Sequence, residues 1–333
     1  MAGNVQVIHS DGLAEFFQGG TDGAVVLSLD FHSYRISSAD ELSASKAPLN
    51  DNDQSMQHET ITADDGEQLH VHLSGSGTPI LLLHGWTANH AAWSPLVAPL
   101  SKHYRLLRPD ARGHGGHPLT VNHEPDVKRL ARDIINLLDH FEIERIAAVG
   151  HSMGALTLWQ CIRDFGGERF SHLAFIDQSP KLMTDDMWHM GIYGDFDSAR
   201  AQRFIDDLDA DFVEAVLRLI AFGLNDKARE TYLRNSSGWR AAREALRNIN
   251  PHSAIAIWRS LVAGDYRDVL ATIDAPTLLA YGTSSNFYPR EAAQFVASRI
   301  PKARLSFYEG ADHGPHLLQP DRFAGELIAL LNG

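Results

Sequence analysis

The chain has 333 residues, 44% of them hydrophobic, which is enough for one large core or for a core with a smaller insertion. Its formal net charge is −13 at pH 7, and this acidity argues against a nucleic-acid or anionic-membrane partner. The single cysteine, Cys161, excludes an intramolecular disulfide and predicts a cytoplasmic location, and no apolar stretch is long enough to span a membrane.

Residues 1–58 form an N-terminal extension whose start lacks the basic and apolar pattern of a secretory signal. Within the extension, residues 12–17 suggest the start of a short helix and residues 24–30 a strand. Residues 37–57 are polar and rich in Asp, Ser and Asn, which is typical of a linker. Two interpretations stay open: a mobile tail, or an arm that packs on a neighbour, as in a homo-oligomer, or over the functional site.

From residue 59 onward the pattern becomes regular. Residues 59–63 and 68–73 alternate apolar with polar side chains around an Asp-Asp-Gly turn, which predicts a β-hairpin. His70 and His72 would lie on one face of the second strand, but no third ligand follows at a spacing typical of a metal site. We therefore expect two solvent-facing histidines and no metal.

Short buried strands then alternate with amphipathic helices. This order predicts an α/β fold with a doubly wound, mainly parallel sheet. The expected strands are residues 79–84, 104–110, 146–149, 172–177, 276–282 and 304–309, and the expected helices are residues 125–141, 155–162, 291–300 and 323–331.

The alternation stops between residues 180 and 258, where the pattern is helical and rich in Met, Phe and Trp. An insertion after a strand would lie at the carboxyl edge of the sheet and form a helical cap over the site. Its apolar side chains favour a bulky apolar ligand over a sugar or phosphate. The predicted domains are thus the extension (1–58), an α/β core (59–180 and 256–333) and a cap (181–255).

A Gly-x-Ser-x-Gly turn stands at the centre of the chain, at residues 150–154, between a predicted strand and a predicted helix. This context places Ser152 at a sharp corner with its hydroxyl exposed, as a nucleophile requires. The helix N-terminus directs free N–H groups, that of Met153 first, toward the position where an oxyanion would form.

Together with three further motifs, this turn resembles the α/β-hydrolase superfamily, in its serine-nucleophile branch with a helical cap. The resemblance covers residues 59–333 and implies a hydrolase that needs no cofactor. The matching motifs are the oxyanion loop His84-Gly85-Trp86, the turn Asp110-x-Arg112-Gly113-His114-Gly115 and the catalytic-histidine loop Gly310-Ala-Asp-His313.

The resemblance and the chemistry assign roles to these residues. The Ser152 hydroxyl needs a base, and His313 is the candidate because an imidazole titrates near neutral pH. His151 and His316 are rivals, but His151 is expected to point away from the serine and His316 lies beyond the family's position. The backbone N–H groups of Met153 and Trp86 would form the oxyanion hole.

The triad acid departs from the commonest pattern of the superfamily. The loop of residues 283–289, where the family usually carries Asp, contains no carboxylate, and Asn286 would not stabilise an imidazolium by charge. Some members carry the acid after the strand that follows the nucleophile helix, which here is Asp177. Asp312 is adjacent to His313, and neighbouring side chains seldom face each other. We therefore predict Asp177 as the acid.

These assignments favour a serine hydrolase that cleaves a carboxylic ester or lactone of a hydrophobic or aromatic small molecule through an acyl-enzyme. Three alternatives remain: a cofactor-free dioxygenase, which the resemblance makes less favoured because Ala88 replaces its histidine, a C–C bond hydrolase, and a non-catalytic ligand receptor. We expect the substrate pocket to include His151, Met183, Trp188 and Phe287.

Overall fold

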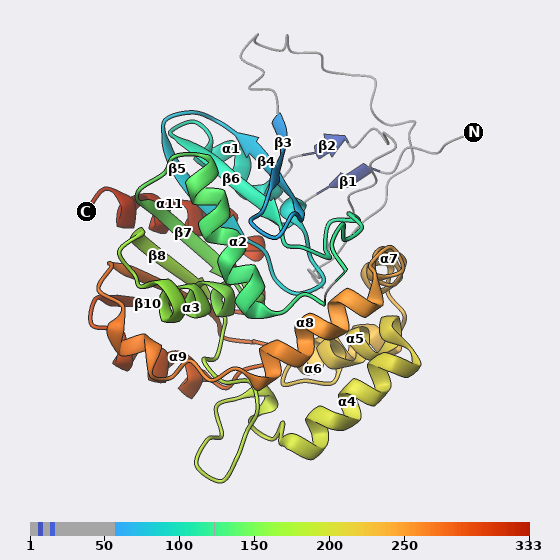
Figure 1. Cartoon of the computed structure of the whole chain (residues 1–333). Helices are drawn as coiled ribbons and strands as arrows, with labels where there is room; N and C mark the ends of the chain where they lie inside the picture. The colour runs from blue at the N-terminus through green and yellow to red at the C-terminus, as the bar shows by residue number, and fades with distance from the viewer. Residues whose placement is uncertain (1–5, 9–13, 17–56, 123) are drawn as a thin grey trace, which may run out of the picture.

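The computed structural model of the chain describes residues 6–8, 14–16, 57–122 and 124–333. Its centre is an eight-stranded sheet (Figure 1). Neighbouring strands run parallel except that β4 pairs antiparallel with both β3 and β6, so the predicted mainly parallel sheet is confirmed. In spatial order the strands are β10 (Ala303–Tyr308), β9 (Thr277–Gly282), β8 (Phe170–Ile176), β7 (Ile146–His151), β5 (Thr78–Leu83), β6 (Tyr104–Asp110), β4 (Gln68–Ser74) and β3 (Gln57–Thr62).

Helices cover both faces of the sheet, as in a doubly wound fold (Figure 1). One face packs against α2 (Val127–His140), α3 (Met153–Phe165) and α9 (Arg290–Arg299), and the other against α1 (Ser94–Leu100) and α11 (Pro320–Leu331). The central strands are buried on both faces, which explains why their sequences are continuous apolar runs rather than alternating ones.

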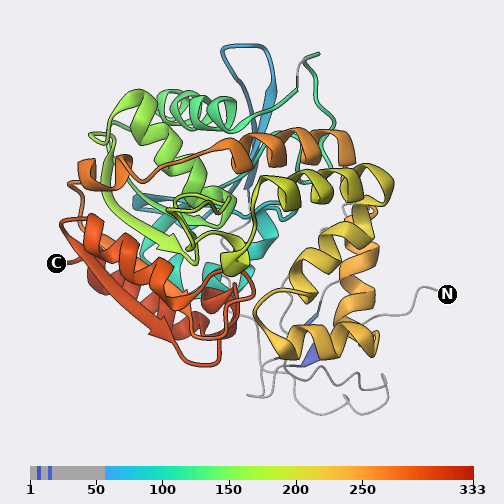
Figure 2. The ribbon, with the colours of Figure 1, turned by 90° about the horizontal axis from the view of Figure 1, so that it is seen from below.

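Five helices lie between β8 and β9 and are grouped beside one end of the sheet (Figures 1 and 2). Four of them begin at an Asp or Asn whose side chain accepts a hydrogen bond from a first-turn N–H, the usual N-cap. The last helix crosses the predicted boundary at residue 256. The five are α4 (Ser198–Ala210), α5 (Phe212–Ala221), α6 (Asp226–Leu233), α7 (Ser237–Leu246) and α8 (Pro251–Ala263).

Short elements complete the described chain, and none of the helices in its described ranges has the length and apolar character needed to cross a bilayer. They are the 3₁₀ helices η2 (His90–Trp93), η3 (Ile192–Gly194) and η4 (Val269–Thr272), the helix α10 (Pro315–Leu318), and the strands β1 (Gln6–Ile8) and β2 (Ala14–Phe16).

The N-terminal extension corrects one prediction. Residues 14–16, for which a helix start was predicted, form β2 and pair antiparallel with β1. Backbone pairing with a neighbouring segment outweighs the weak local helical pattern there. The strand predicted at residues 24–30 lies outside the described residues.

The predicted hairpin is confirmed as β3 and β4, paired from Gln57↔Leu73 to Thr62↔Gln68. The two histidines of β4 are not solvent-facing as predicted, because both are half-buried. The ring of His117, from the loop after β6, stacks on His70 at a centroid distance of 3.5 Å, and that of His90 stacks on His72 at 3.3 Å.

The turn between β7 and α3 allows very close packing of backbone on backbone. A Cβ atom at Gly150 would lie 2.5 Å from the carbonyl carbon of Gly154, and one at Gly154 would lie 2.2 Å from the carbonyl oxygen of Leu83. Neither neighbour is a flexible side chain, so neither can yield. The two glycines therefore let α3 start directly above the ends of β5 and β7.

We predict that Gly154→Ala destabilises the fold by about 1–3 kcal/mol or more, because the added methyl group overpacks a backbone contact. Gly325→Ala, in α11, is the matched control. It also adds a methyl group to a helical glycine, but no atom outside the glycine's own stretch of helix lies within 4 Å of the added carbon. Helix propensity should make the control neutral or up to about 1 kcal/mol more stable. Urea unfolding measures both, and equal stabilities would contradict the packing argument.

Candidate active site

The residues predicted to act together all follow strands of the sheet at their carboxyl ends. Ser152 follows β7, Asp177 follows β8, His313 lies in the loop after β10, and Trp86 lies in the loop after β5. In open α/β sheets this edge is where ligands bind. Ser152 has φ 53° and ψ −116°, the strained backbone of a strand-to-helix corner.

Asp177 and His313 form a direct pair. Nδ1 of His313 lies 2.6 Å from Oδ2 of Asp177, a short distance typical of a charge-assisted hydrogen bond donated by the imidazole. The Asp177 side chain is fully buried, whereas that of His313 is 16% exposed. Because Nδ1 donates to the carboxylate, Nε2 is left with the lone pair that a general base needs.

The loop of residues 283–289 supports the acid instead of supplying it. Ser285 Oγ donates to Oδ2 of Asp177 at 2.6 Å, and the N–H of Gly282 donates to Oδ1 at 3.2 Å. The Ser285 hydroxyl also accepts bonds from the N–H groups of Phe287 and Tyr288, at 3.2 and 3.3 Å. Sequence reasoning missed Ser285, and a hydroxyl in place of the usual carboxylate was the only available signal.

The two side chains considered as substitutes for the acid have other partners. Asn286 Oδ1 accepts a bond from the backbone N–H of His313 at 3.3 Å, and its amide nitrogen donates to the carbonyl of Ile220 at 3.2 Å. Asp312 Oδ1 accepts from the N–H of Gly314 at 2.9 Å. Asn286 therefore positions the backbone of the histidine loop, and Asp312 braces the turn after it.

The rival histidines are also placed. His316 is fully buried, packs 5.0 Å from the Trp93 ring, and burial lowers its pKa to about 3. His151 lines the cavity, and its Nε2 lies 2.9 Å from the backbone carbonyl oxygen of His313. Burial holds the pKa of His151 well below its ordinary value, so this ring stays neutral and donates to that carbonyl.

The loop after β5 approaches Ser152 closely. A Cβ atom at Gly85 would lie 3.3 Å from Cβ of Ser152, and Trp86 and Met153 both line the cavity at this point. The indole nitrogen of Trp86 donates to the carbonyl of Ala254 in α8 at 2.8 Å, which fixes the loop to the inserted helices.

Two buried histidines fix the position of the loop after β5 through hydrogen bonds. Nε2 of His84 accepts from the N–H of Ala111 at 3.0 Å, and Nε2 of His114 accepts from the N–H of Thr87 at 3.2 Å. Burial lowers the pKa of both rings, that of His114 to about 3. Both therefore remain neutral acceptors near pH 7, and the loop keeps its position over the start of α3.

A cavity of about 140 Å³ opens beside Ser152 and His313. The inserted helices supply much of its apolar wall, and no Lys or Arg is among the described residues that line it. Such a wall suits an uncharged apolar ligand. The apolar residues contributed by α5, α7 and α8 are Val216, Leu217, Leu219, Ile220, Leu246, Trp258 and Leu261.

Of the four predicted pocket residues, two line this cavity and two do not. His151 and Phe287 face it, and the Phe287 ring lies 4.5 Å from that of His313. Met183 and Trp188 are absent from the described lining, which corrects the prediction. Trp188 instead packs edge-on against Phe295 of α9, and its indole donates to a backbone carbonyl at 3.0 Å. Leu182 and Ile192 of the same segment do line the cavity, so the packing of each side chain decides which of them face it.

The alpha/beta hydrolase fold family matches residues 78–320. The chain belongs to this family. It is 28% identical over 271 residues to a pimeloyl-(acyl-carrier protein) methyl ester esterase of Vibrio vulnificus strain YJ016, which covers 78% of this chain and 97% of the relative. It is 26% identical over 285 residues to a non-heme haloperoxidase of Rhodococcus erythropolis, covering 81% of this chain and 98% of that one.

The fold is also similar to a solved structure, an esterase of Exiguobacterium antarcticum. The TM-score is 0.72 with 23% identity, and the match covers 83% of this chain and all of the esterase. At this identity the similarity shows the fold alone. The family match begins at residue 78, so residues 1–58 lie outside it.

We predict that Asp177→Asn lowers kcat on any ester that the wild type turns over by roughly 10³–10⁴, because a neutral amide neither fixes the imidazole tautomer nor stabilises the imidazolium. Asp312→Asn is the matched control and should stay within about tenfold of the wild type, a margin that allows for small shifts of the loop. Initial rates at saturating substrate measure both, and circular dichroism checks the folds. Near-normal kcat in Asp177→Asn would remove Asp177 from the triad.

Proposed function

We propose that the protein is a serine hydrolase that cleaves a carboxylic ester or lactone of a hydrophobic small molecule through an acyl-enzyme. The observation that carries this proposal is the convergence on one cavity of Ser152, His313, the loop that bears Trp86 and the first residue of α3, Met153. The buried Asp177 lies behind His313 at hydrogen-bonding distance. This arrangement suits acyl transfer, in which a base activates a hydroxyl beside an oxyanion hole.

In the proposed reaction, Nε2 of His313 accepts the proton of the Ser152 hydroxyl as Oγ bonds to the substrate carbonyl carbon. The carbonyl oxygen becomes an oxyanion, which the N–H groups of Met153 and Trp86 stabilise. His313 then protonates the leaving alkoxide as the C–O bond breaks. A water molecule, deprotonated by the same Nε2, attacks the acyl-enzyme and releases the carboxylic acid and Ser152.

The cavity supports a small and uncharged substrate. An apolar cavity of about 150 Å³ is known to hold a benzene molecule, so a cavity of about 140 Å³ suits a ring or a short chain. The described lining residues include no Lys or Arg and the chain charge is −13, so an anionic substituent of the substrate would find no cationic side chain to pair with there. The esterase name of the Vibrio relative agrees with an ester substrate.

We infer that residues 181–255 act as the cap of this site, because α5 and α7 contribute apolar residues to the cavity wall.

No protein or nucleic-acid partner is required by the proposed reaction. A cytoplasmic location stays a prediction. The only cysteine, Cys161, is fully buried in α3, and burial raises its thiol pKa to about 12, so it takes no part in the chemistry.

We predict that the wild type hydrolyses 4-nitrophenyl acetate and butyrate and that Ser152→Ala lowers kcat at least about 10⁴-fold, because the nucleophile is lost. Ser284→Ala, which removes an exposed hydroxyl, is the control and should keep full activity. Release of nitrophenolate measures the rates. No turnover by the folded wild type would contradict the proposal, and oxygen uptake with aromatic substrates would then test the dioxygenase alternative.

The apolar lining of the cavity leads to a separate prediction about the acyl-chain length of the preferred ester. Leu219→Ala should raise the ratio of kcat/KM for octanoate esters over butyrate esters about tenfold, because truncating this side chain makes room for more methylene groups of the substrate. Each methylene group that fits in an apolar pocket contributes about 1–3 kcal/mol to discrimination between substrates. Leu208→Ala in α4 is the matched control, since Leu208 is equally apolar and buried but is not part of the cavity lining. The same change in both variants would show that the effect is general loosening rather than a wider cavity.

A further inference from the structure

A second group of polar side chains lies away from the active-site cavity, where β3, β4 and the end of β6 meet. It consists of five imidazoles around one carboxylate, that of Asp110, and none of the six residues lines the active-site cavity. Strand register accounts for part of it, because β3 pairs with β4 and β4 pairs with β6. The five imidazoles belong to His58 of β3, His70 and His72 of β4, His90 of η2 and His117 of the loop after β6.

The carboxylate of Asp110 is 1% exposed and is approached from both sides. Oδ1 accepts bonds from the backbone N–H of His90 at 2.7 Å and from its Nδ1 at 2.9 Å. Oδ2 lies 3.3 Å from Nε2 of His117 and 3.5 Å from Nε2 of His72. Nδ1 of His90 also lies 3.0 Å from Oδ2, so His90 reaches both carboxylate oxygens, and two further ring nitrogens converge on Oδ2.

The separations on the second oxygen are those of metal ligands. Zn²⁺ bonds to imidazole nitrogen and carboxylate oxygen are about 2.0–2.2 Å long, so ligand atoms at the corners of a tetrahedral site lie about 3.3–3.5 Å apart. The two nitrogen–oxygen distances, 3.3 and 3.5 Å, are close to that edge. Nε2 of His72 is buried, and its contact with Oδ2 of Asp110 at 3.5 Å is longer than an ordinary hydrogen bond.

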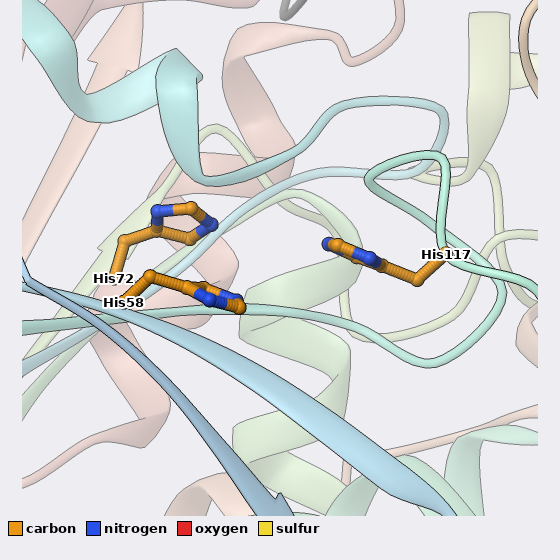
Figure 3. A group of neighbouring side chains, drawn as sticks. All are labelled: His58, His72 and His117. Atoms are coloured by element: carbon orange, nitrogen blue, oxygen red, sulfur yellow. The ribbon is translucent and has the colours of Figure 1, made fainter. Parts of the chain in front are cut away.

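His58 completes the group. Its ring and those of His72 and His117 each offer a nitrogen, and these three nitrogens lie within 4.8 Å of one another. Figure 3 shows His58 and His72 on neighbouring strands and His117 reaching toward them from the opposite side. His58 is exposed and His117 is 31% exposed, so small side-chain rotations can bring the three nitrogens to the tetrahedral spacing.

Ring stacking holds two of these imidazoles in place. His70 stacks on His117 and His72 on His90, at centroid distances of 3.5 and 3.3 Å. This stacking fixes the ring planes of His72 and His117, the two imidazoles that approach Oδ2 of Asp110 from β4 and from the loop after β6.

We propose that His58, His72 and His117, together with Oδ2 of Asp110, form a binding site for Zn²⁺. Three imidazoles and one carboxylate supply four protein ligands, the number of a closed structural zinc site. The ion would connect β3 and β4 to the loop after β6. Through the bond between Asp110 and the backbone of His90, it would also brace the segment that follows the oxyanion loop.

The test is isothermal titration of untagged, full-length protein with ZnCl₂ after dialysis against EDTA. We expect one Zn²⁺ per wild-type chain and at least about 100-fold weaker binding in the double variant His58→Ala/His117→Ala. The matched control, His103→Ala/His252→Ala, removes two exposed histidines elsewhere and should bind as the wild type does. Both substitutions of the test pair lie on partly or fully exposed side chains, so the fold should persist, which circular dichroism checks.

Two further readouts separate a built site from adventitious binding. Co²⁺ in place of Zn²⁺ should give the intense visible absorption of four-coordinate cobalt, and Zn²⁺ should raise the unfolding temperature of the wild type but not of the test variant. Equal Zn²⁺ affinity in the wild type and the test variant would overturn the proposal. So would the weak absorption of six-coordinate cobalt, which indicates surface binding through water.

Discussion

The buried carboxylate of Asp177 is the interaction on which the rest of the candidate active site depends. A fully buried charge costs several kcal/mol unless it is paired and hydrogen-bonded. Here the ring of His313, the hydroxyl of Ser285 and the N–H of Gly282 all donate to it. These donors come from residues 282–285, at the end of β9 and in the loop after it, and from the loop after β10. Together with Asp177 itself, three segments that are separate in sequence are therefore held at one point. The ring of His313, the predicted base, is oriented by the hydrogen bond that it donates to this carboxylate.

Backbone strain is concentrated at the same edge of the sheet. Ser152 and Asp177 both have positive φ, 53° and 45°, a conformation that costs a non-glycine residue about 1–3 kcal/mol. Each is held there by the neighbouring strand, because the N–H of Ser152 bonds to the carbonyl of Ile176 at 3.2 Å and that of Asp177 to Ala280 at 2.9 Å. The parallel pairing of β7, β8 and β9 thus fixes the two residues in conformations that an isolated loop would not keep.

Local sequence patterns predicted most of the fold and most of the candidate site. Continuous apolar runs predicted the buried strands, because a strand covered on both faces has no polar side, and the Gly-x-Ser-x-Gly turn placed Ser152 between strand and helix. Contacts between segments that are far apart in the sequence leave no local sequence pattern from which they could be predicted. The bond from Ser285 to Asp177 joins two loops after different strands, and Trp188 is apolar whether it faces a cavity or α9. Side-chain type predicts burial, but only the packing decides what an apolar side chain contacts.

The histidine group around Asp110 could not be predicted from sequence spacing either. Spacing along β4 offered two ligands, and the others come from the partner strand and from a loop, where no fixed spacing leads to them. Asp110 and Asp177 are both buried carboxylates that end a strand, yet their surroundings differ. Asp177 has one imidazole, whose donated bond leaves the outer nitrogen basic and facing a cavity. Asp110 has three imidazoles within 3.5 Å and does not line the cavity beside Ser152. The first arrangement favours proton transfer, whereas the role proposed for the second is to hold a cation between several imidazoles.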